Sequence, residues 1–278
     1  MLKSLLAIAD GGDKTVATLK TAQLAARNCD AWLDVLHISP DAEPMAVFAA
    51  GEGMPMVGVA EETVRKHIRA RRDAARKAYD TVFGTAGGSR SHWIEQEGRA
   101  IDLLIGDARL ADLVIISRPG DENDELFPGA VNTVLFETGR PALIAPPVPM
   151  ATIGTKVAVA WNDSNQAARA VTAALPLLEH AAEVTILAAG TKEKTESAAK
   201  LSEYLTRHGV KSKTDAYDPG SGSSRARGRS LLQHAQRMNA DLLVMGAYGQ
   251  GRMMQFLGLG GATAKVITAN TMPLLMAH

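Results

Sequence analysis

The glycine-rich stretch at residues 246–263 carries the clearest sign of ligand chemistry in the sequence. It reads GAYGQGRMMQFLGLGGAT and follows a short apolar run at 241–245. Glycines let backbone N–H groups approach an anion, and a helix that begins after the loop adds partial positive charge. The only charged residues between 246 and 269 are the cations Arg252 and Lys265. The pattern predicts a phosphate-binding loop, although the same glycines also suit an ordinary connection between a strand and a helix.

Residues suited to catalysis or metal binding form no comparable pattern. No Ser/His/Asp order, Cys/His pair or metal-ligand spacing stands out. His180, His208 and His234 fall on or near expected helices, where most histidines are surface residues. We therefore expect no catalytic residues, no metal site and no enzyme.

The composition excludes several classes of protein. A chain of 278 residues that is 46% hydrophobic and 22% charged is typical of one large or two ordinary globular domains. Its 30 basic and 30 acidic residues cancel and aromatics make up 4%, which disfavours nucleic-acid and membrane partners. The N-terminal apolar run is too short for a signal peptide or a membrane span. The single cysteine, Cys29, cannot form an internal disulfide, so we expect a reducing, cytoplasmic location.

Alternating strands and helices must position these residues. Apolar runs predict strands at 5–9, 31–38, 93–97, 112–116, 141–145, 156–160, 183–187, 211–217, 240–244 and 273–277. Helical patterns cover 15–27, 59–83, 101–109, 130–137, 167–178, 194–207, 230–238 and 262–269. Residues 40–58 and 218–228 are expected as loops. In the second loop Arg225, Arg227 and Arg229 suit either a clamp for an acidic partner or a solvated surface.

The second half of the chain repeats the order of the first. A proline-rich linker at 146–149 stops the first pattern, and the run that begins Ala111-Asp-Leu returns as Ala240-Asp-Leu. This repeat predicts two tandem, doubly wound α/β domains, 1–146 and 152–278, each with a five-stranded parallel sheet.

Four features in a fixed order resemble the universal stress protein family. They are the strand-end Asp10-Gly-Gly, the repeated Ala-Asp-Leu run, the Gly-x2-Gly loop and the proline that leads the final strand of each half. The resemblance covers both halves and implies a tandem member with the adenine nucleotide alpha hydrolase-like fold. It also implies that the strands at 141–145 and 273–277 pair as a pseudo-dimer within the chain, since their bare apolar edges need a partner. A further homodimer stays open.

The resemblance also implies a nucleotide site. Nucleotide-binding members carry Gly-x2-Gly-x9-Gly-Ser/Thr after the fourth strand and an adenine-contacting Asp after the first. Here ten residues separate Gly249 from Gly260, and Asn162 replaces the Asp but still offers a carbonyl oxygen. We expect adenine near the ends of the first two strands of the second half, and phosphates and ribose near the glycine-rich loop. The expected contact residues are Asn162, Ala189, Gly246, Tyr248, Gly249, Gly260, Gly261, Ala262 and Thr263.

The first half keeps the adenine-type Asp10 but has a degenerate phosphate loop. Ser117 occupies the position of Gly246, and Pro119 removes a backbone donor. Four carboxylates follow, at Asp121, Glu122, Asp124 and Glu125. Because they would repel a triphosphate, we expect at most one nucleotide per chain, bound in the second half.

Three functions stay open. The first is a stress-response regulatory protein that binds ATP, ADP or AMP, with or without Mg²⁺. The second is a scaffold of the same fold that acts through unknown protein partners and binds no nucleotide. The third and weakest is an enzyme acting on a small molecule, and weak ATP hydrolysis is left open.

Overall fold

The computed structural model describes residues 1–278 except 43–56, 85–89, 121–128, 191, 220–221 and 249–260. The first half consists of β1 Ser4–Ile8, α1 Thr15–Cys29, β2 Trp32–Pro40, α3 Val57–Phe83, β3 Ser91–Gly98, α4 Ala100–Ala108, β4 Leu113–Ser117, α5 Ala130–Glu137 and β5 Ala142–Ala145. The second half consists of β6 Lys156–Trp161, α6 Asn165–Leu178, β7 Glu183–Ala189, α7 Lys192–Arg207, β8 Ser212–Tyr217, α8 Ser224–Arg237, β9 Leu242–Gly246, α10 Ala262–Ala269 and β10 Leu274–Ala277.

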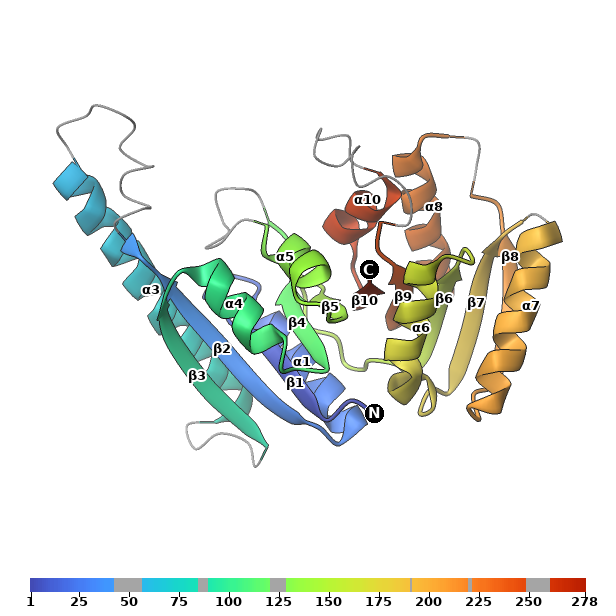
Figure 1. Cartoon of the computed structure of the whole chain (residues 1–278), viewed down its shortest axis with the longest axis horizontal. Helices are drawn as coiled ribbons and strands as arrows, with labels where there is room; N and C mark the ends of the chain where they lie inside the picture. Colours follow the sequence, from blue (N-terminus) through green and yellow to red (C-terminus); the bar gives the residue numbers. More distant parts are fainter. Residues whose placement is uncertain (43–56, 85–89, 121–128, 191, 220–221, 249–260) are drawn as a thin grey trace.

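The strands form one ten-stranded sheet that runs through both halves (Figure 1). Its order is β3-β2-β1-β4-β5-β10-β9-β6-β7-β8. All neighbours are parallel except β5 and β10, which pair antiparallel with Leu143 opposite Leu275. The predicted α/β fold class and the predicted pairing of the two final strands are therefore confirmed.

Helices cover both faces of the sheet. Along β1, Leu5 and Ala7 pack into a core with α1, α3, α6 and α7, whereas Leu6 and Ile8 pack into a second core with α4, α5, α8 and α10. Strands buried on both faces read as continuous apolar runs, because neither set of alternating side chains meets water. This burial explains why the inner strands are predictable from the sequence, whereas the edge strands β3 and β8 are only half-buried and carry polar residues.

The repeated Ala-Asp-Leu run ties the fourth strand of each half to its first. The Asp112 carboxylate accepts hydrogen bonds from the backbone N–H groups of Lys3 (2.7 Å) and Ser4 (3.0 Å). Asp241 likewise accepts from the N–H groups of Thr155 (3.1 Å) and Lys156 (2.8 Å). The same residue thus satisfies the same pair of strand-start donors in each half.

The loop expected at 218–228 is partly wrong. Helix α8 begins at Ser224, six residues before the predicted start, and the Ser223 side chain caps it by accepting from the Ala226 N–H group. Gly228 lies inside this helix. The residue is a glycine because a Cβ there would lie 2.6 Å from the Ala262 carbonyl oxygen of α10. The glycine therefore serves close helix packing and does not mark a loop. Most of the loop expected at 40–58 lies outside the described residues.

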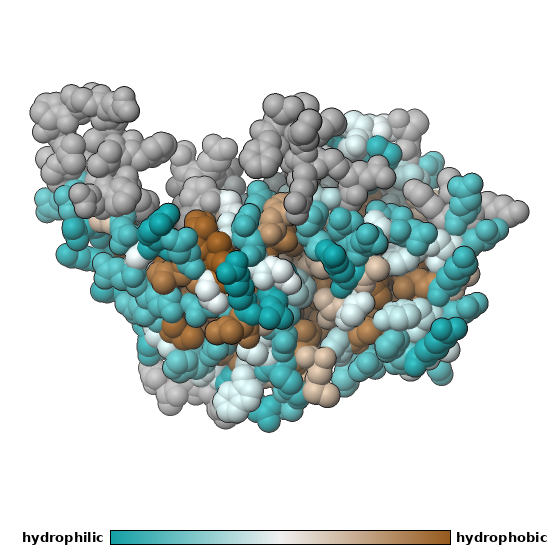
Figure 2. Space-filling view, viewed as in Figure 1, coloured by the Kyte–Doolittle hydropathy of each residue, from teal (hydrophilic) through white to brown (hydrophobic). Residues whose placement is uncertain are grey.

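Figure 2 shows apolar side chains gathered over α4 on an otherwise largely polar face. Ile101 there is 37% exposed, and Leu110, just after the helix, is 82% exposed. Among the described residues, no helix is long and apolar enough to cross a membrane.

Candidate functional site

The strand order of the sheet creates two crevices. It reverses between β1 and β4 in the first half and between β6 and β9 in the second. Doubly wound folds bind ligands outside the carboxyl ends of the strands at such switch points. Each half therefore offers one candidate site.

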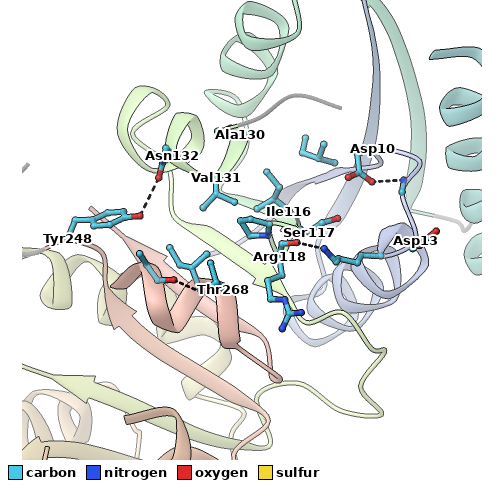
Figure 3. A pocket seen from close by; sticks show the side chains of 18 residues that line it. Asp10, Asp13, Ile116, Ser117, Arg118, Ala130, Val131, Asn132, Tyr248 and Thr268 are labelled. Atoms are coloured by element: carbon cyan, nitrogen blue, oxygen red, sulfur yellow. Dashed lines mark hydrogen bonds between the residues drawn. The ribbon is translucent and has the colours of Figure 1, made fainter. Parts of the chain in front are cut away.

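The first-half crevice holds a cavity of about 230 Å³ (Figure 3). The loop after β1, the residues after β4 and the start of α5 line it, together with Tyr248 and α10 of the second half. A tertiary contact between the halves therefore completes this cavity. This cavity lies outside the ligand site that the sequence predicts, which is in the second half.

Asp10 and Lys14 shape one side of the cavity. The Asp10 Oδ1 atom accepts hydrogen bonds from the Gly12 N–H group (3.0 Å) and the Thr15 hydroxyl (2.6 Å), which hold the loop that starts α1. The Lys14 ammonium group donates to the Arg118 carbonyl oxygen at 3.3 Å and so reaches the residues after β4. The Asp10 carboxylate thus orders the loop before α1, and Lys14 of this loop faces the cavity.

The N-terminus of α5 forms the opposite side. Gly129 precedes the helix in the left-handed region, with φ 82°, and no side chain of the described residues caps it. The first backbone N–H groups of a helix have no partner within the helix. Ala130, Val131 and Asn132 supply those groups here, and all three line the cavity.

Helix α3 packs directly against the loop that follows β1. Gly11 has φ 77°, and a Cβ there would lie 2.0 Å from the Arg71 carbonyl oxygen. A Cβ on Gly12 would lie 3.0 Å from Nη1 of the buried Arg71 guanidinium group. The glycines next to Asp10 thus let α3 approach the loop closely.

The second-half crevice contains Asn162 and Gly246, which correspond to Asp10 and Ser117 of the first half. Oδ1 of Asn162 accepts hydrogen bonds from the Ser164 hydroxyl (2.7 Å) and N–H group (3.3 Å). Ser164 in turn caps α6. Gly246 packs against the start of α6, since a Cβ there would lie 2.6 Å from the Ala167 nitrogen. Ala189 ends β7 and is half-buried.

The remaining predicted site residues surround the start of α10. Gly261 precedes this helix with no side-chain cap among the described residues, and Ala262 and Thr263 begin it. The Thr263 hydroxyl accepts a hydrogen bond from the Tyr248 N–H group at 3.3 Å. Gly249 and Gly260 lie outside the described residues.

The side chain of Tyr248 is turned toward the first half (Figure 3). Its hydroxyl donates to Oδ1 of Asn132 at 3.3 Å, and its ring stacks on Phe136 with centroids 5.3 Å apart. Burial raises the pKa of this tyrosine above its ordinary value. Only the backbone of Tyr248 therefore faces the site predicted in the second half, while its side chain lines the cavity of the first.

Comparison with solved structures agrees with this architecture. A universal stress protein from Archaeoglobus fulgidus DSM 4304 superposes with a TM-score of 0.66 at 16% identity, over 99% of this chain and 96% of that protein. The chain has the tandem universal stress protein fold. The resemblance seen in the sequence is thereby confirmed at the level of the fold.

Shorter universal stress proteins match about half of the chain. UspA from Lactobacillus plantarum covers 52% of this chain with 97% of its own length, at 16% identity and a TM-score of 0.39. A universal stress protein solved in complex with cAMP covers 53% of this chain with 99% of its own length, at 16% identity and a TM-score of 0.30. No protein-family model and no curated protein matches the sequence.

Proposed function

We propose that the protein is a nucleotide-binding regulatory protein of the universal stress type, acting in the cytoplasm. One adenine nucleotide would bind in the second half, at the switch point between β6 and β9. The observation that carries the proposal is that the glycine-rich sequence after β9 leads into α10, whose start has no side-chain cap among the described residues. Backbone N–H groups and the helix dipole at that point favour a phosphate group.

Charge supports the choice of the second half. The sequence between Gly246 and Ala269 contains no carboxylate, whereas four acidic residues follow Gly120 in the first half. In the second half, adenine would lie near Asn162 and Ala189. The Asn162 carbonyl oxygen already accepts two hydrogen bonds from Ser164, so adenine would replace the longer of the two or use the N–H donors of the same amide.

The phosphates and ribose would contact the residues around the start of α10. The proposed set is Gly246, the Tyr248 backbone, Gly249, Gly260, Gly261, Ala262 and Thr263. A triphosphate would carry its own Mg²⁺; the described residues hold no group of three His, Cys, Asp or Glu side chains placed to bind a metal ion. The proposed role is regulatory binding and not catalysis, with slow ATP hydrolysis left to measurement.

One observation favours a second candidate, a scaffold of the same fold that binds no nucleotide. Gly246 packs so closely on Ala167 that packing alone explains why this residue is a glycine. If this holds for the other glycines of the motif, the loop would serve packing alone, and the protein would act through protein partners.

Mass spectrometry of small molecules released from the purified protein distinguishes the two candidates. Nucleotide binding predicts that ATP, ADP or AMP is released. It also predicts that saturating nucleotide raises the melting temperature, because a ligand that binds only the native state stabilises it. No released nucleotide and no shift with any of the three would favour the scaffold.

A further inference from the structure

The cavity between the halves plays no part in the proposed nucleotide site. We propose that it binds a small monocarboxylate with an apolar body, such as a short branched or aromatic acid. The proposal goes beyond nucleotide binding and does not depend on it. Size, lining, hydrogen-bond donors and charge each support it.

The cavity is small. Its volume of about 230 Å³ falls below the roughly 300–1,000 Å³ of pockets that hold drug-sized ligands. The loop next to Asp10 cannot shift toward α3 to enlarge the cavity, because the backbone of Gly11 already abuts Arg71. The space suits a compact acid and not a nucleoside triphosphate.

The walls are largely apolar. Ile8 and Ile116 come from the strand ends, Val131 from α5 and Ile267 from α10, and each is less than 8% exposed. Apolar surface buried on binding contributes about 25 cal/mol per Å². A ligand with a hydrocarbon body therefore gains affinity from contact with all four.

Hydrogen-bond donors lie at two places around this apolar space. One place is the start of α5, whose N–H groups have no side-chain cap in the described part of the chain, and the other is the Lys14 ammonium group. Oδ1 of Asp10 is already occupied by two hydrogen bonds from its own loop. Neither Lys14 nor Arg118, which also lines the cavity, forms an ion pair with any described residue. A carboxylate supplies the acceptors that these donors need.

Nearby carboxylates favour a singly charged ligand. Asp10 and the exposed Asp13 line the cavity. Coulomb repulsion grows in proportion to the charge of the ligand, so these groups penalise a triphosphate several times more than a monoanion. The same residues that disfavour ATP therefore leave room for a monocarboxylate.

The second half completes the site. Tyr248, Ala264, Ile267 and Thr268 close the cavity on the side away from Asp10. Thr268 is exposed at the rim, and its hydroxyl donates to the Ala264 carbonyl oxygen within α10. A large side chain at position 268 would therefore fill the cavity from the second half without entering the core.

Calorimetry and thermal unfolding with benzoate and isovalerate test the proposal on the full chain. Both acids should bind and raise the melting temperature, whereas benzyl alcohol, a neutral analogue of benzoate, should not. Lys14→Met should weaken binding by about tenfold or more, because a charged hydrogen bond is lost. Thr268→Trp should abolish it.

Two matched controls accompany these variants. Lys20→Met removes an exposed lysine of α1, the helix that Lys14 precedes, and Thr206→Trp alters an exposed threonine of α7 with the same hydrogen bond to the carbonyl four residues earlier. Both should bind the acids like the wild type. Absence of binding by either acid, equal binding of benzyl alcohol, or full binding by both cavity variants would overturn the proposal.

A competition experiment separates this proposal from nucleotide binding. ATP should not displace bound benzoate, because the two ligands occupy different crevices. Displacement with competitive kinetics would place both in one cavity and overturn the assignment. Failure of ATP to bind, with benzoate bound as expected, would count against the proposed function alone.

Discussion

The Tyr248 hydroxyl donates a hydrogen bond to Oδ1 of Asn132 at 3.3 Å, and this contact links the two halves at the cavity. Tyr248 stands one residue before the Gly249 of the proposed phosphate loop, and Asn132 lies in the first turn of α5. The tyrosine backbone is left-handed, with φ 55°, which is rare for a residue other than glycine. The ring contact with Phe136 holds it in place.

We predict a measurable coupling between Tyr248 and Asn132. Tyr248→Phe should lower the free energy of unfolding by about 0.5–1.5 kcal/mol, the usual net value of one hydrogen bond. In a double-mutant cycle with Asn132→Ala, chemical denaturation should show that the two effects are not additive. Additive effects would mean that the hydrogen bond contributes nothing to stability.

Asp112 should make stability depend on pH. Burial pushes its pKa upward, but hydrogen bonds from the Lys3 and Ser4 backbones outweigh this effect, so its pKa lies below the ordinary value. A depressed pKa stabilises the fold above the unfolded-state pKa of about 3.9, and this stabilisation is lost as pH falls through the folded-state pKa. Asp112→Asn should therefore cost about 1–2 kcal/mol at pH 7.

The difference between wild type and Asp112→Asn should shrink as the pH falls below about 4. Urea denaturation at pH 7 and at the lowest pH where both proteins fold measures it. Asp107→Asn alters a half-buried carboxylate of α4 and serves as the control. A difference that stays constant over this range would contradict the assigned role of the Asp112 charge.

Cys29 should be unreactive toward thiol reagents. Burial raises the pKa of its thiol to about 11, and the nearby charges of Lys3 and the N-terminus only partly offset this. The thiolate is the reactive form, so near pH 8 its amount should be roughly a hundredfold lower than for a thiol of ordinary pKa. Iodoacetamide labelling of the native and the urea-unfolded chain measures the difference, and equal rates would contradict it.

Gly249→Asp should abolish nucleotide binding. The substitution adds a Cβ and a negative charge at the proposed phosphate position. Gly120→Asp, at the corresponding position of the first half, serves as the matched control and should leave nucleotide binding unchanged. Titration calorimetry should also give at most one nucleotide per chain. Unaltered affinity in Gly249→Asp, or two nucleotides per chain, would contradict the assignment to the second half.

Most of the fold could be predicted from the sequence, because the strands between the two edge strands β3 and β8 are largely buried and read as apolar runs. Helices α5 and α10 have the predicted bounds, and the proline before each final strand marked β5 and β10 within one residue. The sequence does not predict the start of α8, because a glycine such as Gly228 is typical of a loop. Position 228 needs a glycine because the helix packs closely on Ala262 of α10, which only the tertiary structure shows.

The candidate sites could be predicted only in part. The sequence placed Asn162 and Gly246 at the second switch point, and the structure puts both there. It gave no sign that Tyr248 reaches across to Asn132, since that contact depends on how β5 and β10 bring the halves together. The cavity went unpredicted for the same reason, because its lining comes from segments more than 100 residues apart.

The antiparallel seam between β5 and β10 has a consequence for how the two sites can change over evolution. In an assembly of two identical subunits, each substitution appears in both copies at once, so one site cannot specialise without the other. Here Leu143 and Leu275 face each other across the seam but are encoded separately. Pro119 could therefore replace a phosphate-loop donor in one half while Tyr248 arose at the matching position of the other, and subunit exchange can never re-create a symmetric pair.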